Sequence, residues 1–157
     1  MSKKNSYTLI IIDMQKYFET SQKKSVIKNC QKEIKKAMKL HNHIMFVEYD
    51  DCGKTDKRLT KLTKGYKNKS RVIKGCDNGS DEIYDKIEKW KLARKNLRVC
   101  GVNTDACVKR TVIGLCEYLP MSNIVLVKNA CNTCGKVWHE EALNIMKDSY
   151  FCKLAAA

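Results

Sequence analysis

Short apolar segments alternate with amphipathic segments along the chain, and this alternation limits the possible folds more than any other feature. Residues 7–13 and 43–49 are apolar runs of strand length, and residues 21–41 between them repeat apolar side chains at helical spacing. Further strands are predicted at 70–74, 97–102, 123–127 and 150–152, with helices at 56–64, after 80, after 103 and at 136–147. Strands that alternate with helices favour a parallel sheet covered on both faces. We therefore predict an α/β protein, a three-layer α/β/α sandwich with a mostly parallel, about six-stranded Rossmann-like sheet.

The length and composition of the chain fit a single domain. It has 157 residues, 43% of them hydrophobic, which is enough to bury a core without metal or disulfide cross-links. We predict one domain over residues 1–152 and interpret 153–157 as a vector-derived tail that takes no part in the fold. The sequence shows no apolar leader and no apolar run long enough to cross a membrane, so we expect a cytoplasmic protein without membrane partners. Its nine cysteines are then expected to be reduced.

The formal net charge of +14, from 31 Lys and Arg against 17 Asp and Glu, raises the question of nucleic-acid binding. Most of the excess is lysine, and it is spread along the chain rather than gathered into an arginine-rich patch interleaved with aromatic residues. We therefore expect solvated basic faces and no nucleic-acid partner. A nucleic-acid-associated protein remains an alternative, which steep salt dependence of oligonucleotide binding would support.

The stretch from Val99 to Val108 has the form of a reactive site. An apolar strand end turns through Gly101 into a helix that carries Cys107 in its first turn. Unpaired backbone N–H groups and the positive end of the helix macrodipole favour thiolate over thiol at such a position. We therefore predict a lowered pKa and a nucleophilic role for Cys107. The alternative is a small buried hydrophobe, which is how free cysteines usually behave.

Two further polar residues close apolar strands. Asp13 follows the aliphatic run 9–12, so its carboxylate is expected to be partly desolvated, with a raised pKa suited to proton transfer. Lys74 ends the strand at 70–74, where its ammonium can stabilise a thiolate and hold Asp13 ionised. Because strand ends of a parallel sheet share one edge, all three groups are expected at the same rim. The alternatives are a turn-capping aspartate and a lysine that reaches solvent.

Three motifs in order resemble the isochorismatase-like cysteine hydrolases, a superfamily that includes nicotinamidases and N-carbamoylsarcosine amidohydrolases. They are Asp13-x-Gln15-x-x-Phe18, the strand-ending Lys74, and the run from Gly101 to Val108, which reads Gly-Val-x-Thr-Asp-x-Cys-Val. The resemblance runs over roughly residues 7 to 149. It implies a C–N hydrolase that acts on a small amide, ureido or carbamoyl compound through a thioester on Cys107, with Asp13 and Lys74 completing the catalytic triad.

The resemblance also implies how the reaction would be supported. The backbone N–H groups of Asn103 and Cys107 would form the oxyanion hole, and a cis peptide would join Val102 to Asn103. Gln15, Phe18, Glu48 and Tyr49 are the candidates to line the substrate pocket. A homo-oligomer is usual among the relatives, and the partner is a small-molecule substrate.

Other features separate this chain from particular members of the superfamily. Nicotinamidases carry histidines after the second strand that bind a metal, whereas residues 48–54 contain no histidine. His41 and His43 lie at the opposite end of that strand. We therefore predict no metal site and no cofactor, and we do not favour nicotinamide as the substrate. A family member that binds or sequesters a small ligand without turnover is the main alternative.

Overall fold

Six strands form one parallel sheet in the computed structural model, which describes residues 6–157. The strands are β1 (Thr8–Ile12), β2 (His43–Tyr49), β3 (Lys69–Lys74), β4 (Asn96–Val102), β5 (Asn123–Asn132) and β6 (Lys153–Ala155). Their order is β3-β2-β1-β4-β5-β6, and every neighbouring pair is parallel. The order reverses between β1 and β4, which is the place where ligands bind in such sheets.

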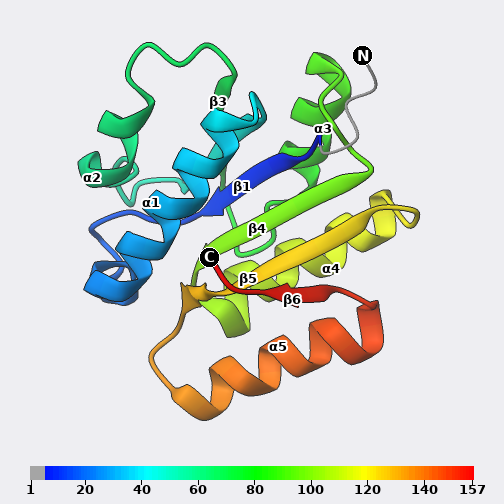
Figure 1. Ribbon diagram of the computed structural model, residues 1–157. Helices are drawn as coiled ribbons and strands as arrows, with labels where there is room; N and C mark the ends of the chain where they lie inside the picture. Colours follow the sequence, from blue (N-terminus) through cyan, green and yellow to red (C-terminus); the bar gives the residue numbers. More distant parts are fainter. Residues whose placement is uncertain (1–5) are drawn as a thin grey trace.

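Helices cover both faces of this sheet (Figure 1). They are α1 (Lys24–Lys39), α2 (Lys57–Thr60), α3 (Ser80–Trp90), α4 (Lys109–Tyr118) and α5 (Lys136–Tyr150), with the short helices η1 (Glu19–Gln22), η2 (Lys61–Thr63) and η3 (Thr104–Val108). Helix α1 packs against β1, β2 and β5 and contacts α2, whereas α3, α4 and α5 contact one another in a row. The predicted three-layer α/β/α sandwich and its parallel, six-stranded Rossmann-like sheet are therefore confirmed.

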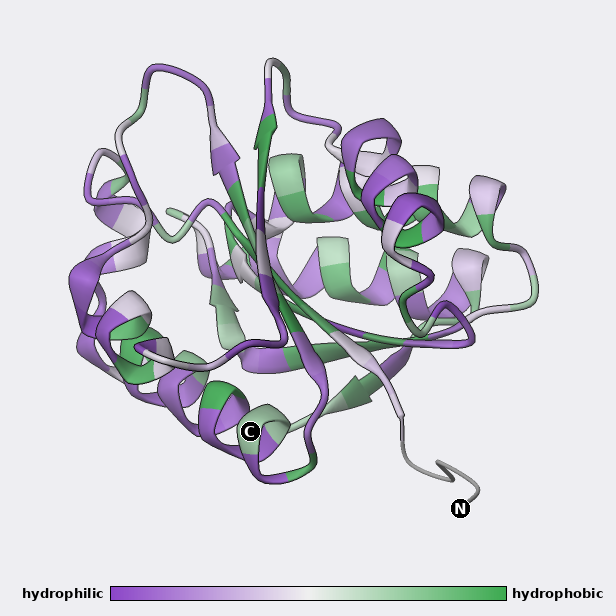
Figure 2. Ribbon diagram, turned by 90° about the horizontal axis from the view of Figure 1, so that it is seen from above, coloured by the Kyte–Doolittle hydropathy of each residue, from purple (hydrophilic) through white to green (hydrophobic). Residues whose placement is uncertain are grey.

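The core lies between the sheet and the helices. All five residues of β1 are buried, and α1 buries Val26, Ile27, Cys30 and Ile34 on the stripe predicted from helical spacing. Figure 2 shows the hydrophobic colour concentrated on the strands and on the helix sides that face them. The central strands are apolar on both faces because both faces are covered, which is the pattern of a parallel sheet.

The end of the chain differs from the prediction. Helix α5 continues to Tyr150 and ends at Phe151, whose φ of 57° is left-handed, so residues 150–152 do not form the expected strand. Instead Lys153–Ala155 pairs with Val125–Val127 of β5 as the edge strand β6. The expectation that residues 153–157 take no part in the fold is wrong. A short segment can pair its backbone with a sheet edge whatever its origin, and a vector-derived origin of this tail stays a prediction.

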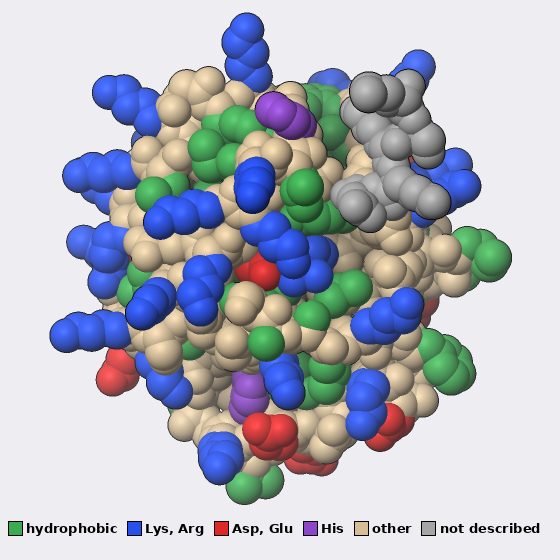
Figure 3. Space-filling model, in the orientation of Figure 1, with side chains coloured by type: hydrophobic (Ala, Val, Ile, Leu, Met, Phe, Trp, Pro, Cys, Tyr) green, Lys and Arg blue, Asp and Glu red, His purple; other side chains and the backbone are tan. Residues whose placement is uncertain are grey.

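Basic side chains cover much of the surface. Helix α1 contributes Lys24, Lys28, Lys32, Lys35, Lys36 and Lys39. Figure 3 shows Lys and Arg side chains spread over this face, with few acidic groups between them. No helix among residues 6–157 is both long and apolar enough to span a membrane.

Candidate active site

The sheet brings Asp13 and Lys74 into contact at the ends of β1 and β3. Both side chains are fully buried, and Lys74 Nζ lies 3.0 Å from Asp13 Oδ2. The ammonium also donates to the carbonyl oxygen of Cys76 at 3.0 Å and lies 4.0 Å from the centre of the Tyr49 ring. A buried lysine needs such partners, because an unpaired charge in the interior is costly. The strand-end positions thus meet as the sequence predicts.

Cys107 joins this pair from η3. Its side chain is 3% exposed. Burial raises the pKa of Asp13 and outweighs the charge of Lys74 and hydrogen bonding with Cys107, which both lower it. A carboxylate whose pKa is raised is a stronger base than an exposed one.

The expected lowering of the Cys107 pKa is wrong. Burial, followed by the negative charge of Asp13, raises the pKa of this thiol to about 12, and the charge of Lys74 offsets only part of the rise. A helix N-terminus contributes only a fraction of a unit charge, whereas removing a thiolate from water can shift a pKa by several units. In the free protein Cys107 is therefore a neutral thiol that needs a base.

This raised pKa makes a prediction for alkylation. In the absence of substrate, the rate at which iodoacetamide labels Cys107 should rise about tenfold per pH unit between about pH 7 and pH 10, because the thiolate fraction grows until the pH reaches the pKa. Labelling of a thiol of ordinary pKa levels off above about pH 8.5. The rates are measured by peptide mass spectrometry against glutathione as a reference. A plateau near pH 7 would contradict the raised pKa.

The turn before Cys107 has a conformation other than the one expected. The structure contains no cis peptide among its described residues, so the expected cis bond between Val102 and Asn103 is wrong. A trans bond costs less, and the turn is made instead by Gly101 at φ 128° and by Asn103 at φ −33°. The Asn103 carbonyl accepts from the N–H groups of Ala106 and Val108. The oxyanion hole formed by Asn103 and Cys107 stays a prediction.

Two of the residues predicted to bind substrate, Gln15 and Glu48, form hydrogen bonds within the protein. Gln15 donates to the carbonyls of Tyr49 and Gly53 at 2.9 and 2.6 Å and accepts from the Tyr49 N–H at 2.8 Å. Glu48 accepts from the N–H and the hydroxyl of Thr55, both at 2.8 Å, and its other oxygen pairs with Arg71. In the β2–β3 ladder Glu48 pairs with Ile73, and the next residue, Tyr49, pairs with Lys74. Because side chains alternate along a strand, Glu48 faces away from the site.

Phe18 and Tyr49 are better placed to meet a substrate. Tyr49 lies opposite Lys74 in the β2–β3 ladder, so both side chains share one face of the sheet. The rings of Phe18 and Tyr49 meet edge to face, with centroids 6.3 Å apart. Both residues are only partly buried. They form an aromatic wall beside the buried triad, although their contact with a substrate stays a prediction.

Sequence reasoning missed Asp77. This residue lies in the loop 75–79 between β3 and α3, and its Oδ1 accepts from the Cys107 thiol at 3.7 Å. Its own charge adds to the rise in the pKa of both Asp13 and Cys107. The available signal was its position three residues after Lys74, in the loop that leaves the same end of the sheet. Aspartates in loops often only cap turns, so this position alone does not predict a site residue.

The side chains of the described residues do not suit a metal ion. No three His, Cys, Asp or Glu residues among positions 6–157 converge as a candidate ligand set. Glu48, the carboxylate at the end of β2, is already engaged by Thr55 and Arg71. His43 lies at the other end of β2 and bonds Ser70 at 2.8 Å. The polar side chains at this end of the sheet therefore have protein partners rather than the arrangement of a metal-ligand set.

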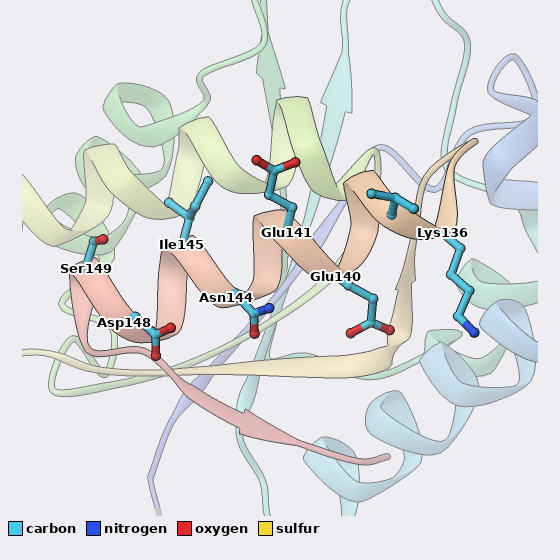
Figure 4. A pocket seen from close by; sticks show the side chains of 8 residues that line it. Lys136, Glu140, Glu141, Asn144, Ile145, Asp148 and Ser149 are labelled. Carbon is cyan, nitrogen blue, oxygen red and sulfur yellow. The ribbon is translucent and has the colours of Figure 1, made fainter.

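A hollow of about 780 Å³ on the outer side of α5 is separate from this site (Figure 4). Its lining comes from that helix alone and includes Glu140, Glu141 and Asp148. Its lining contains none of Asp13, Lys74 and Cys107, which are buried at the ends of β1 and β3 and in η3. The thiol and carboxyl groups at the ends of the strands are the candidate active site.

Comparison with known proteins agrees with the fold. A family model described as the isochorismatase domain matches residues 7–156. The nicotinamidase from Bacillus subtilis superposes with a TM-score of 0.80 at 19% identity, covering 95% of this chain and 98% of that one. The nicotinamidase from Staphylococcus aureus superposes with a TM-score of 0.82 at 18% identity, covering 100% of this chain and 99% of that one. The MAR1 ribonuclease from Caenorhabditis elegans superposes with a TM-score of 0.82 at 19% identity, covering 96% of this chain and 77% of that one. No curated protein matches the sequence.

Proposed function

Because the chain belongs to the isochorismatase domain family, we propose that it is a cysteine-dependent hydrolase that cleaves the C–N bond of a small amide, ureido or carbamoyl compound. The observation that carries this proposal is the fully buried pair of Asp13 and Lys74, 3.0 Å apart, together with the buried Cys107 thiol, whose pKa responds to the charges of both. Such chemistry requires a nucleophile, a base and a cation that stabilises the charged form of the base.

In the first half of the reaction Asp13 takes the proton of Cys107 as the sulfur attacks the carbonyl carbon. The thiol pKa of about 12 means that the negative charge on sulfur need not exist before substrate arrives. Lys74 balances the charge that moves between the carboxylate and the sulfur. Backbone N–H groups of Asn103 and Cys107 would hold the oxyanion of the tetrahedral intermediate.

In the second half Asp13 returns its proton to the leaving nitrogen, so the C–N bond breaks and ammonia or an amine departs. The acyl group stays on Cys107 as a thioester. Asp13, again a carboxylate, takes a proton from water, and the resulting hydroxide equivalent attacks the thioester carbon. Release of the acid returns the proton to the Cys107 sulfur and restores both groups.

The proposal is tested by ammonia release from a panel of primary amides, ureides and carbamoyl compounds that includes nicotinamide. We expect turnover of at least one class, and in the presence of hydroxylamine a hydroxamate as a second product, because a thioester transfers its acyl group to that nucleophile. Nicotinamide is not the expected best substrate. Tight binding of a panel member with neither product would favour the alternative, a protein that sequesters a small ligand.

A further inference from the structure

Asp77 places a second carboxylate against the candidate nucleophile. Its Oδ1 lies 3.7 Å from Cys107 Sγ, whereas the other carboxylate near the sulfur, that of Asp13, is paired with Lys74. The two carboxylates differ in access to water: the Asp13 side chain is fully buried, and that of Asp77 is 37% exposed. Asp77 is therefore the carboxylate near the sulfur that is open to solvent.

The loop that carries Asp77 is fixed on both sides. The Thr111 hydroxyl, buried on α4, donates to the Asp77 carbonyl at 3.3 Å and accepts from the Gly79 N–H at 2.9 Å. On the other side, Lys74 Nζ donates to the Cys76 carbonyl at 3.0 Å. A Cβ at Gly79 would lie 2.7 Å from Lys74 Cδ, so the loop packs tightly against the lysine stem. The backbone that carries this carboxylate is therefore held in place before any substrate binds.

The ion pair of Asp77 with Arg110 is too weak to neutralise the Asp77 carboxylate. Arg110 Nε is 3.8 Å from Asp77 Oδ2, and the arginine side chain is 64% exposed. An exposed pair at this distance is weak and exchanges readily with water. The electrostatic effect of Asp77 at the sulfur is consistent with this, since its charge adds to the rise in the Cys107 pKa. The carboxylate can therefore accept hydrogen bonds from a substrate.

We propose that Asp77 is a substrate-recognition residue. Its carboxylate accepts N–H hydrogen bonds from the nitrogen bound to the attacked carbon, and it repels a negative charge near that carbon. The substrate class is then a neutral or cationic amide, ureido or carbamoyl compound whose nitrogen carries hydrogen, and not an anionic one. This inference rests on the proposed function, because it takes Cys107 as the nucleophile that the substrate approaches.

Charge-matched thiol reagents test this without knowledge of the substrate. The neutral methyl, cationic aminoethyl and anionic sulfonatoethyl methanethiosulfonates are compared by their rates at Cys107, followed by peptide mass spectrometry. The cation-to-anion rate ratio is independent of the thiolate fraction, because both reagents meet the same sulfur. Asp77→Asn should lower this ratio about tenfold, the size expected for removing one charge close to the sulfur in a largely aqueous setting.

Controls separate this effect from a general change in surface charge. Asp148→Asn makes the same charge change on α5, where the side chain is 67% exposed, and should leave the ratio unchanged. The exposed Cys134 in the same samples gives an internal reference. Arg110→Gln alters only an exposed partner and should raise the ratio at Cys107 several-fold, so it decides the matter if Asp77→Asn does not fold.

The outcomes distinguish this inference from the proposed function. If the neutral reagent modifies Cys107 but the ratio is the same in the wild type, Asp77→Asn and Arg110→Gln, recognition by Asp77 is overturned and the nucleophile stands. If the neutral reagent leaves Cys107 unmodified at every pH, both proposals fail. A fall of the ratio in Asp77→Asn, or a rise in Arg110→Gln, together with an unchanged ratio in Asp148→Asn, supports the inference.

Discussion

Replacing Cys107 with alanine is expected to lower turnover of any amide substrate by about a thousandfold or more, because no other group can form the thioester. Eight other cysteines are present, but Cys107 is the one buried in η3, directly after β4, with its thiol 3.7 Å from Asp77. The measurement is ammonia release by Cys107→Ala and by the wild type at the same protein concentration, with hydroxamate formation as a second readout.

The same substitution should leave the fold in place. Exchanging one buried sulfur for hydrogen removes little apolar volume, so we expect a loss of about 1 kcal/mol or less in the free energy of unfolding. Cys134→Ala is the matched control, since it alters an exposed cysteine and should retain full activity. Residual activity of Cys107→Ala above a few per cent of the wild type, in a folded protein, would reject the assignment of the nucleophile.

The sequence predicted that Asp13 and Lys74 would meet because the rule behind this prediction is geometric. Asp13 and Lys74 are polar residues that close apolar strands, and the ends of parallel strands meet at one edge. No comparable rule covers Asp77, which contacts the sulfur from a loop whose path depends on Thr111 and on the Lys74 side chain. Loops are placed by tertiary contacts, and these contacts have no periodic signature.

Burial and hydrogen bonding limit what the sequence could predict of the site. A buried amide or carboxylate must satisfy its own hydrogen bonds first, as Gln15 and Glu48 do, and their contact with a substrate stays a prediction. Those bonds go to neighbouring backbone groups and to Thr55 and Arg71. The prediction of a lowered Cys107 pKa was wrong because desolvation depends on how completely the thiol is buried and not on its place in a helix.

Gly101→Ala is expected to destabilise the protein by about 4 kcal/mol, because it combines a forbidden backbone conformation with a steric clash. Gly101 has φ 128°, and a Cβ there would lie 2.1 Å from the carbonyl oxygen of Ile12. Ile12 is its partner in the β1–β4 ladder and immediately precedes Asp13. The new methyl group would therefore separate two central strands beside Asp13. Urea unfolding followed by circular dichroism measures the change as a shift in the midpoint.

A matched variant distinguishes the two contributions. Gly65 also has a positive φ, 77°, but a Cβ there would meet nothing within 4 Å. Gly65→Ala should therefore cost only the backbone penalty, about 1 kcal/mol. The difference between the two variants measures the close approach of β4 to β1. Equal losses would mean that this approach is loose in solution, and the sheet would then not hold Asp13 and Cys107 in the contact on which the proposed chemistry depends.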